Sequence, residues 1–143
     1  MVQDNKHVSR RFTELFGTDD GSLADTVFTE DVVFHGLQGG DLHGIEATKA
    51  FIAAYRTAFP DARSTVEDQV AEGEKVVTRW RARGTHTGVL GELPPTGRAF
   101  DVGGITIERI VDGRIAEVWV ARDELGMLHQ LGALPARATA GAA

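Results

Sequence analysis

The sequence predicts an α+β fold in which a curved antiparallel sheet wraps around N-terminal helices to form a cone. Apolar residues recur at helical spacing up to Pro60, and beyond it they alternate with polar residues, as in strands. An apolar helix stripe and an apolar sheet face must be buried against each other. Because twisted sheets curl, such a sheet encloses an interior when it packs on helices, and we expect the functional site there.

Three helices are expected before Pro60. The first ends at Gly17, the second begins at the N-cap Ser22, and the third runs over 45–59 until Pro60 stops it. The apolar residues that define them at helical spacing are Val8, Phe12, Leu15 and Phe16, then Leu23, Val27 and Phe28, then Ala47, Phe51, Ala54, Tyr55 and Ala58.

The strands are bounded by turn signals. Asp112-Gly113 is the strongest hairpin signal in the chain, and residues 72–74 have the composition of a second hairpin turn. Residues 36–44 and 87–98 are rich in glycine or proline and are expected to be loops, while 123–131 reads as a terminal helix. The predicted strands cover residues 31–35, 64–70, 75–86, 100–110 and 114–122.

Composition places the chain among globular proteins and excludes several classes. A length of 143 residues suggests one domain, which we assign to 1–132, with 133–143 as a flexible tail. The net charge of −6 argues against a nucleic-acid partner, and the lack of cysteine excludes disulfides and thiolate sites. No apolar run is long enough for a membrane span, and the N-terminus lacks the apolar core of a signal peptide, so a cytoplasmic location is expected.

Alternation along 75–86 indicates which side of that strand faces the interior. Arginines at every second position, Arg79, Arg81 and Arg83, cannot face an apolar core, so Trp80 and His86 on the other side are expected to point inward. Both could contact a ligand, and both could equally be ordinary core residues.

The last two strands are harder to orient. Arg109 shares a face with Gly103, Ile105 and Ile107, and we expect this face to be inward. The side that carries Trp119 leads to Asp123, but the opposite side of the final strand is nearly as apolar, so its orientation stays open. Asp123 itself precedes an apolar helical run, where an aspartate is a good N-cap and need not be a catalyst.

Several short motifs together resemble one family. These are Phe59-Pro60-Asp61, Gly84-Thr85-His86-Thr87-Gly88, Pro95-Thr96-Gly97, Asp112-Gly113-Arg114-Ile115, and Trp119 with Asp123, Gly126 and Gln130-Leu131-Gly132. Over about residues 5–132 the chain resembles the SnoaL-like polyketide cyclases, within the fold group of nuclear transport factor 2 and ketosteroid isomerase. That resemblance implies the cone-shaped fold, a homodimer, and ring closure by intramolecular aldol condensation without metal or cofactor.

The resemblance also implies site residues. Its acid/base residue falls on Asp123, and a histidine fourteen positions earlier in those cyclases is replaced here by Arg109. We therefore hypothesise that Asp123 removes a carbon-bound proton and that Arg109 or a histidine stabilises the resulting enolate oxygen. His35, Trp80, His86 and Trp119 are the candidate substrate-binding residues.

Two classes of function stay open. One is a cofactor-independent enzyme on an apolar, oxygenated, polycyclic small molecule, with cyclisation as the leading case and hydroxylation or isomerisation as alternatives. The other is a noncatalytic ligand-binding module of the same fold. The five histidines lack the spacing of a metal site, and no phosphate-binding or dinucleotide motif occurs, so no metal or cofactor is expected.

Overall fold

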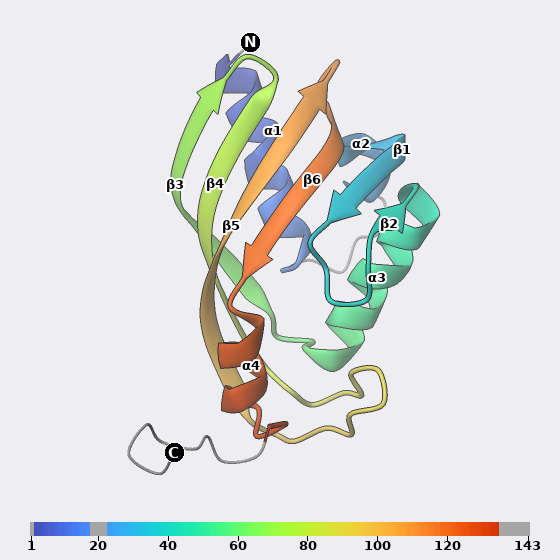
Figure 1. Ribbon diagram of the computed structural model, residues 1–143, viewed down its shortest axis with the longest axis vertical. Coiled ribbons are helices and arrows are strands. Elements are labelled where there is room, and N and C mark those ends of the chain that lie inside the picture. The colour runs from blue at the N-terminus through green and yellow to red at the C-terminus, as the bar shows by residue number, and fades with distance from the viewer. Residues whose placement is uncertain (1, 18–22, 135–143) are drawn as a thin grey trace.

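The computed structural model describes residues 2–17 and 23–134 (Figure 1). The predicted cap Ser22 and residues 135–143 of the predicted tail lie outside this part. The helices are α1 (Val2–Leu15), α2 (Leu23–Val27), α3 (Ile45–Ala58) and α4 (Glu124–Gln130). The strands are β1 (Phe28–His35), β2 (Leu42–His43), β3 (Arg63–Glu72), β4 (Lys75–Thr85), β5 (Ala99–Val111) and β6 (Arg114–Arg122).

The six strands form one curved sheet in the order β2-β1-β6-β5-β4-β3. Figure 1 shows α1 running behind the sheet, α3 beside its β1–β2 edge, and α4 below the end of β6. The predicted α+β cone is confirmed. One pairing was not expected from the sequence: β1 begins at Phe28 rather than at residue 31 and runs parallel to β6, whereas the other neighbours are antiparallel.

Turns and helix ends follow the local signals. Asp112 and Gly113 both have positive φ, at 50° and 80°, as a tight hairpin between β5 and β6 requires. Helix α3 begins after Gly44, whose φ of 91° favours glycine, and ends at Ala58, with Phe59 as its C-cap immediately before Pro60. Within the described residues, none of the helices has the length and apolar character needed to cross a bilayer.

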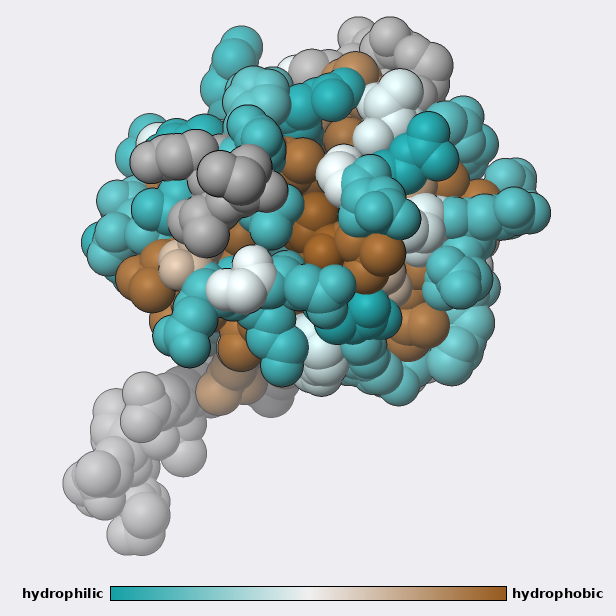
Figure 2. Space-filling view, turned by 90° about the horizontal axis from the view of Figure 1, so that it is seen from above, coloured by the Kyte–Doolittle hydropathy of each residue, from teal (hydrophilic) through white to brown (hydrophobic). Residues whose placement is uncertain are grey.

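Two apolar clusters fill the interior. The larger one packs α1, α2 and β1 against the middle of the sheet, with Phe12 in edge-to-face contact with Phe28 and Phe34. The smaller one joins the end of α3 to β4, β5 and α4 around Phe59 and Phe100. At the end of the molecule seen in Figure 2, hydrophilic side chains surround a smaller apolar area.

A bulge in β6 decides which of its side chains face inward. Arg109 pairs with Glu117 but Ile110 pairs with Ile115, so Ala116 is an extra residue on β6. The extra residue shifts the alternation, and Ile115 and Val118 are both fully buried although they are three positions apart. Beyond the bulge the inward positions are 118, 120 and 122, and the outward positions are 117, 119 and 121.

Large side chains on the inner face lie over glycines of the neighbouring strand. Trp80 on β4 pairs with Gly104 on β5, and a Cβ at Gly104 would lie only 2.4 Å from the indole. Phe100 on β5 pairs with Gly84 on β4, where a Cβ would lie 2.8 Å from the ring. These glycines allow the two rings to lie against the sheet, and Trp80 thereby forms one wall of the interior.

Candidate functional site

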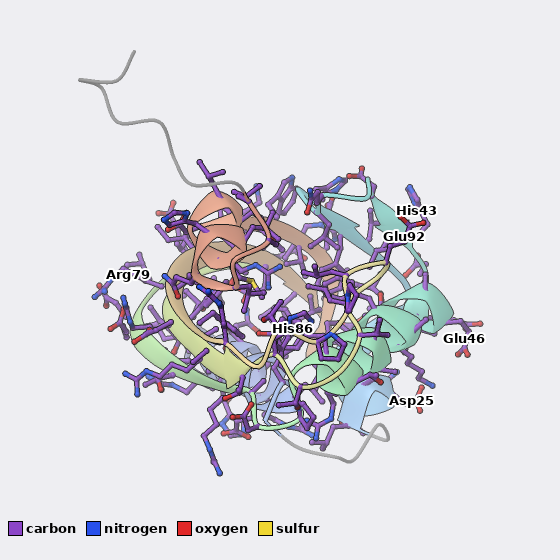
Figure 3. All side chains as sticks on the ribbon, turned by 90° about the horizontal axis from the view of Figure 1, so that it is seen from below. Asp25, His43, Glu46, Arg79, His86 and Glu92 are labelled. Carbon is purple, nitrogen blue, oxygen red and sulfur yellow. The ribbon has the colours of Figure 1, made fainter. Side chains whose placement is uncertain are left out.

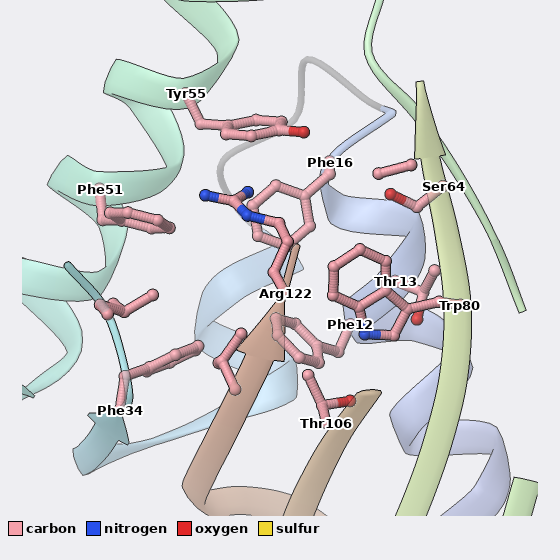
Figure 4. Close-up of a pocket in the computed structure, with 13 residues that line it drawn as sticks. Phe12, Thr13, Phe16, Phe34, Phe51, Tyr55, Ser64, Trp80, Thr106 and Arg122 are labelled. Atoms are coloured by element: carbon pink, nitrogen blue, oxygen red, sulfur yellow. The ribbon is translucent and has the colours of Figure 1, made fainter. Parts of the chain in front are cut away.

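An internal cavity of about 60 Å³ lies between α1, α3 and the inner face of the sheet (Figure 4). Aromatic rings make up most of its wall, and a few hydroxyl groups and one guanidinium supply the polar contacts. The lining residues are Phe12, Thr13, Phe16, Phe34, Leu37, Phe51, Tyr55, Ser64, Trp80, Ala82, Thr106, Val120 and Arg122. We call this space the inner cavity.

A wider hollow of about 320 Å³ adjoins the inner cavity and lies between α3, α4 and residues 37–42. We call it the outer hollow. Leu37, Phe51, Tyr55 and Arg122 line both spaces, so the two are continuous except for these side chains. A polycyclic ligand would need both spaces.

Arg122 lies at the junction of the two spaces. It is the last inward-facing residue of β6, and its side chain is only 16% exposed. Its Nε donates to Glu124 over 2.8 Å, and its guanidinium lies 5.8 Å from the centre of the Tyr55 ring. Figure 4 shows the guanidinium extending between the α3 aromatics and Phe16. A cation held in this way can bind a carbonyl, enolate or carboxylate oxygen of a ligand.

The Tyr55 hydroxyl stays neutral in this environment. Burial raises the pKa of Tyr55 to about 12, although Arg122 beside it acts in the opposite direction. Tyr55 can therefore donate a hydrogen bond at neutral pH, and it cannot act as a phenolate base.

Glu108 is a fully buried acid next to the inner cavity. It lies on the inner face of β5, and its Oε1 accepts hydrogen bonds from Thr106 (2.9 Å) and Ser9 (3.0 Å). Burial raises the pKa of the Glu108 carboxyl to about 7, against the smaller opposing effect of these two hydrogen bonds. Thr106 lines the inner cavity, so a single hydroxyl separates Glu108 from its contents.

Arg109 lies on the opposite side of the sheet from Glu108. Its Nε donates to Glu117 over 3.1 Å, and Glu117 also binds His35 Nε2 over 2.6 Å. His35 Nδ1 contacts Asp41 over 2.9 Å. The expectation that Arg109 faces the interior beside Asp123 is wrong, because the inward residues of β5 are those at even positions.

This outer cluster, Asp41–His35–Glu117–Arg109, also contains Trp119. The Trp119 ring stacks on His35 with centroids 5.4 Å apart, and the ammonium of Lys75 lies 5.4 Å from its centre. Hydrogen bonds to Glu117 and Asp41 raise the pKa of His35, while the hydrogen bond from His35 is the main cause of the lowered pKa of Glu117. His35 and Trp119 are therefore brought together, but away from the inner cavity.

Asp123 caps α4. Its Oδ1 accepts the backbone N–H of Gly126 over 2.9 Å, and its side chain occupies the space that a Cβ at Gly126 would fill. The residue is exposed and lines neither the inner cavity nor the outer hollow. The capping interpretation is confirmed. Since Arg122 faces inward, the next residue along an extended chain faces outward.

His86 and Trp80 point inward as predicted, but only Trp80 lines the cavity. His86 is fully buried, with Nδ1 3.0 Å from the Thr96 hydroxyl and its ring 5.5 Å from that of Phe59. In the view of Figure 3 it lies between α3 and the loop that follows β4, whereas Arg79, His43 and Glu46 point away from the molecule. His86 thus anchors this loop through Thr96.

Sequence reasoning missed Arg122 and Glu108. Glu108 could have been found, since it lies in one alternating row with the apolar residues Phe100, Val102 and Ile110. Arg122 depends on the bulge at Ala116, for which the sequence carries no clear signal. In the residues that the structure describes, His, Asp and Glu side chains form no group that could hold a metal ion.

Comparison with known proteins places the chain in a family. The model of the SnoaL-like polyketide cyclase family matches residues 6–131. Aklanonic acid methyl ester cyclase DnrD of Streptomyces peucetius is 36% identical over 93 residues, which is 64% of this chain and 64% of that enzyme, so the match spans less than two thirds of its length.

Solved structures agree with this match. TsrD from Streptomyces laurentii has a TM-score of 0.83 and 30% identity, covering 92% of this chain and 97% of that one. Wild-type IdmH from Streptomyces antibioticus has a TM-score of 0.76 and 31% identity, covering 90% and 98%. The fold and the match over nearly the whole length lead to one conclusion: the chain belongs to the SnoaL-like polyketide cyclase family.

Proposed function

We propose that the protein is a cofactor-independent cyclase that closes a ring in an apolar, oxygenated, polycyclic small molecule by intramolecular aldol condensation. The observation that carries this proposal is the interior itself, where aromatic walls surround a small number of fixed polar groups. Flat polycyclic ligands fit such walls, and the guanidinium of Arg122 is placed where a ligand oxygen would enter from the outer hollow.

The proposed reaction moves one proton and forms one carbon–carbon bond. A base takes a proton from the carbon next to a carbonyl, the enolate carbon attacks a second carbonyl carbon, and the new alkoxide takes up a proton. All atoms are conserved, and no oxidant is consumed. Arg122 is proposed to stabilise the negative oxygen of the enolate, in the role that we first expected of Arg109.

The base is a separate part of the proposal. Family resemblance designates Asp123, which directly follows Arg122 at the end of β6. To act on a ligand in the outer hollow, its carboxylate would have to leave the N-cap of α4, at a cost of about 1 kcal/mol. Asp123→Asn keeps the cap but removes the base, so turnover should fall by about a hundredfold or more while stability is retained.

A noncatalytic binding module is the second candidate, and one observation favours it. Among the described residues, no carboxylate lines the inner cavity, and its only charged group is Arg122. A protein of this kind would bind the same ligands through the same aromatic rings without moving a proton.

Deuterium exchange separates the two candidates. Aklanonic acid methyl ester, named in the relative from Streptomyces peucetius, would be incubated with the protein in deuterium oxide and followed by mass spectrometry and chromatography. If the protein is an enzyme, it should accelerate either deuterium exchange at the acidic carbon or the closure of the ring. The Asp123→Asn variant should accelerate neither. Binding without exchange or ring closure would favour the module, and no binding of this or related polyketides would contradict both candidates.

We also propose a homodimer that forms through the outer face of the sheet. Ile105 and Val77, on neighbouring strands, are 46% and 36% exposed there, which is high for large apolar residues in mid-strand. Sedimentation velocity should detect a dimer that Ile105→Glu dissociates. A wild-type protein that stays monomeric at high concentration would contradict this part of the proposal.

A further inference from the structure

We propose that Glu108 is a positioning residue that sets whether the Thr106 hydroxyl donates or accepts a hydrogen bond at the wall of the inner cavity. This inference deepens the proposed function and rests on it only in assuming that ligands occupy the inner cavity. It concerns two adjacent inward positions of β5, of which Thr106 contacts the cavity and Glu108 is completely buried behind it.

When Glu108 is ionised, its Oε1 accepts from both neighbouring hydroxyls. Thr106 Oγ1 donates over 2.9 Å and Ser9 Oγ over 3.0 Å. A hydroxyl has one hydrogen, so Thr106 then has only lone pairs to offer to a ligand. In this state the cavity wall accepts hydrogen bonds at this point.

When Glu108 is neutral, its proton belongs on Oε1. The other oxygen, Oε2, is buried and has no hydrogen-bond partner in the part of the chain that the structure describes, so a proton there would find no acceptor. A proton on Oε1 must be accepted by Thr106 or by Ser9, and one of these two hydroxyls has to turn.

The hydrogen bonds behind Ser9 oppose its turning. Ser9 Oγ lies 2.7 Å from Thr78 Oγ1, which in turn accepts from Gln69 Nε2 over 3.2 Å. The same Nε2 donates to the carbonyl of Lys6, which fixes the orientation of the amide. If Ser9 accepted from Glu108, it would donate to Thr78 Oγ1 instead, and the hydrogen of the buried Thr78 hydroxyl would lose its acceptor. Among the described residues, Thr106 has no such chain behind it, so it is the hydroxyl that turns and presents its hydrogen to the cavity.

The groups that face Glu108 from the surrounding elements carry no charge. Ser9 comes from α1, and Val76 and Val118 are its cross-strand neighbours on β4 and β6. The charged side chains on these elements lie elsewhere: Arg10, Lys75 and Arg79 are exposed, Lys6 lines a separate surface groove, and Arg109 pairs with Glu117 on the outer face. Protonation of Glu108 therefore depends on its burial and its hydroxyl partners, and it falls near neutral pH.

Fluorenone, a flat tricyclic ketone, and its hydrocarbon counterpart fluorene test this inference. The ketone should bind the wild type about three- to tenfold more tightly at about pH 5.5 than at about pH 8.5, since one hydrogen bond is gained. Fluorene should bind equally at both values. Glu108→Gln, whose amide does not titrate, should bind fluorenone equally at both values, and Thr106→Val should bind it weakly at both.

Glu117→Gln is the matched control, because it makes the same chemical change on the outer face and should keep the wild-type dependence. A pH dependence of fluorenone binding that survives Glu108→Gln, or that fluorene shares, would overturn the inference.

A measurement without ligand separates this inference from the proposed function. NMR titration of isotope-labelled glutamate carboxyls should show Glu108 titrating near neutral pH, and Thr106→Val should raise its midpoint, because the carboxylate loses a donor. An unmoved midpoint would contradict the coupling whether or not ligands bind. Failure of all aromatic probes to bind, with the midpoint moving as expected, would instead count against the proposed function alone.

Discussion

The two faces of the β5–β6 hairpin carry the same kinds of side chain and use them in different ways. On the outer face, Glu117 pairs with both Arg109 and His35, all partly open to water. On the inner face, Glu108 accepts hydrogen bonds from two hydroxyls, and Arg122 lines the cavity. Glu108 and Arg109 are consecutive residues, so a single step along the strand separates the two environments.

The comparison shows that burial, more than residue type, decides what an acid can do here. Hydrogen bonds to His35 and Arg109 lower the pKa of Glu117, which stays ionised and makes an ordinary surface ion pair. Burial without a cation raises the pKa of Glu108 to about 7, so that this acid can change its protonation state near neutral pH. The acid of this hairpin that titrates near neutral pH therefore lies on the inner face.

The largest expected effect is on the pH dependence of stability. As the pH rises from about 4.5 to about 7, unfolded Glu108 loses its proton first while the folded protein keeps it, so the free energy of unfolding falls. The shift corresponds to roughly 3 kcal/mol. Urea denaturation over this pH range should show a decline in wild type that is much smaller in Glu108→Gln.

Glu117→Gln should behave in the opposite way. The folded pKa of Glu117 is lowered, so its contribution is present above the unfolded pKa and is lost as the pH falls. Its replacement should therefore leave the decline towards neutral pH intact. Equal slopes in wild type and Glu108→Gln would contradict the distinction between the two faces.

The next effect compares two arginines. Arg122→Met should weaken binding of naphthoate, an aromatic carboxylate, by about ten- to hundredfold, the range expected for a lost charge-assisted hydrogen bond. Arg109→Met should leave the affinity unchanged, since Arg109 lies on the outer face. Calorimetry with naphthalene as the uncharged control would show whether the loss is electrostatic. Equal losses in the two variants would mean that the interior is not the binding site.

A smaller effect concerns the cap of α4. Asp123→Ala should lower the free energy of unfolding by about 1 kcal/mol, whereas Asp123→Asn should change it by only a few tenths, because asparagine also accepts from the Gly126 N–H. Thermal denaturation of the two variants measures the difference. If Asp123→Asn lowered the free energy of unfolding as much as Asp123→Ala does, the carboxylate would have a structural role beyond the cap.

The smallest effect is expected for His35 on the outer face. Its pKa is raised, so its contribution to stability is present below the unfolded pKa and is lost as the pH rises through the folded one. NMR titration should give a midpoint above 6.5 that falls in Glu117→Gln, which removes the main partner. A midpoint that the variant leaves unchanged would show that the ion pair does not form in solution.

Local signals in the sequence predicted most of the fold. Asp112-Gly113 forms the tight turn, Pro60 follows the end of α3, and the arginines of β4 mark its outer face. The parallel pairing of β1 with β6 joins segments far apart in the chain, and it could not be read from local patterns.

The site was harder to predict, because side-chain direction alternates and an error of one residue exchanges the two faces. We placed Arg109 inside because it shares a face with Ile105 and Ile107, yet Ile105 proves to be 46% exposed. The bulge at Ala116 then reverses the alternation within β6, which moves Trp119 outward and Arg122 inward. Both faces of these strands carry apolar residues, so the alternation alone does not show which face points inward.

Mapping a bound ligand by NMR tests the central claim most directly, because it asks which face of the sheet a ligand contacts. Titration of the labelled protein with fluorenone should shift the signals of Phe16, Tyr55, Trp80, Thr106 and Arg122 around the inner cavity. Signals of His35, Arg109, Glu117 and Trp119 should stay in place. Shifts confined to those four outer residues, with the interior unchanged, would contradict the account.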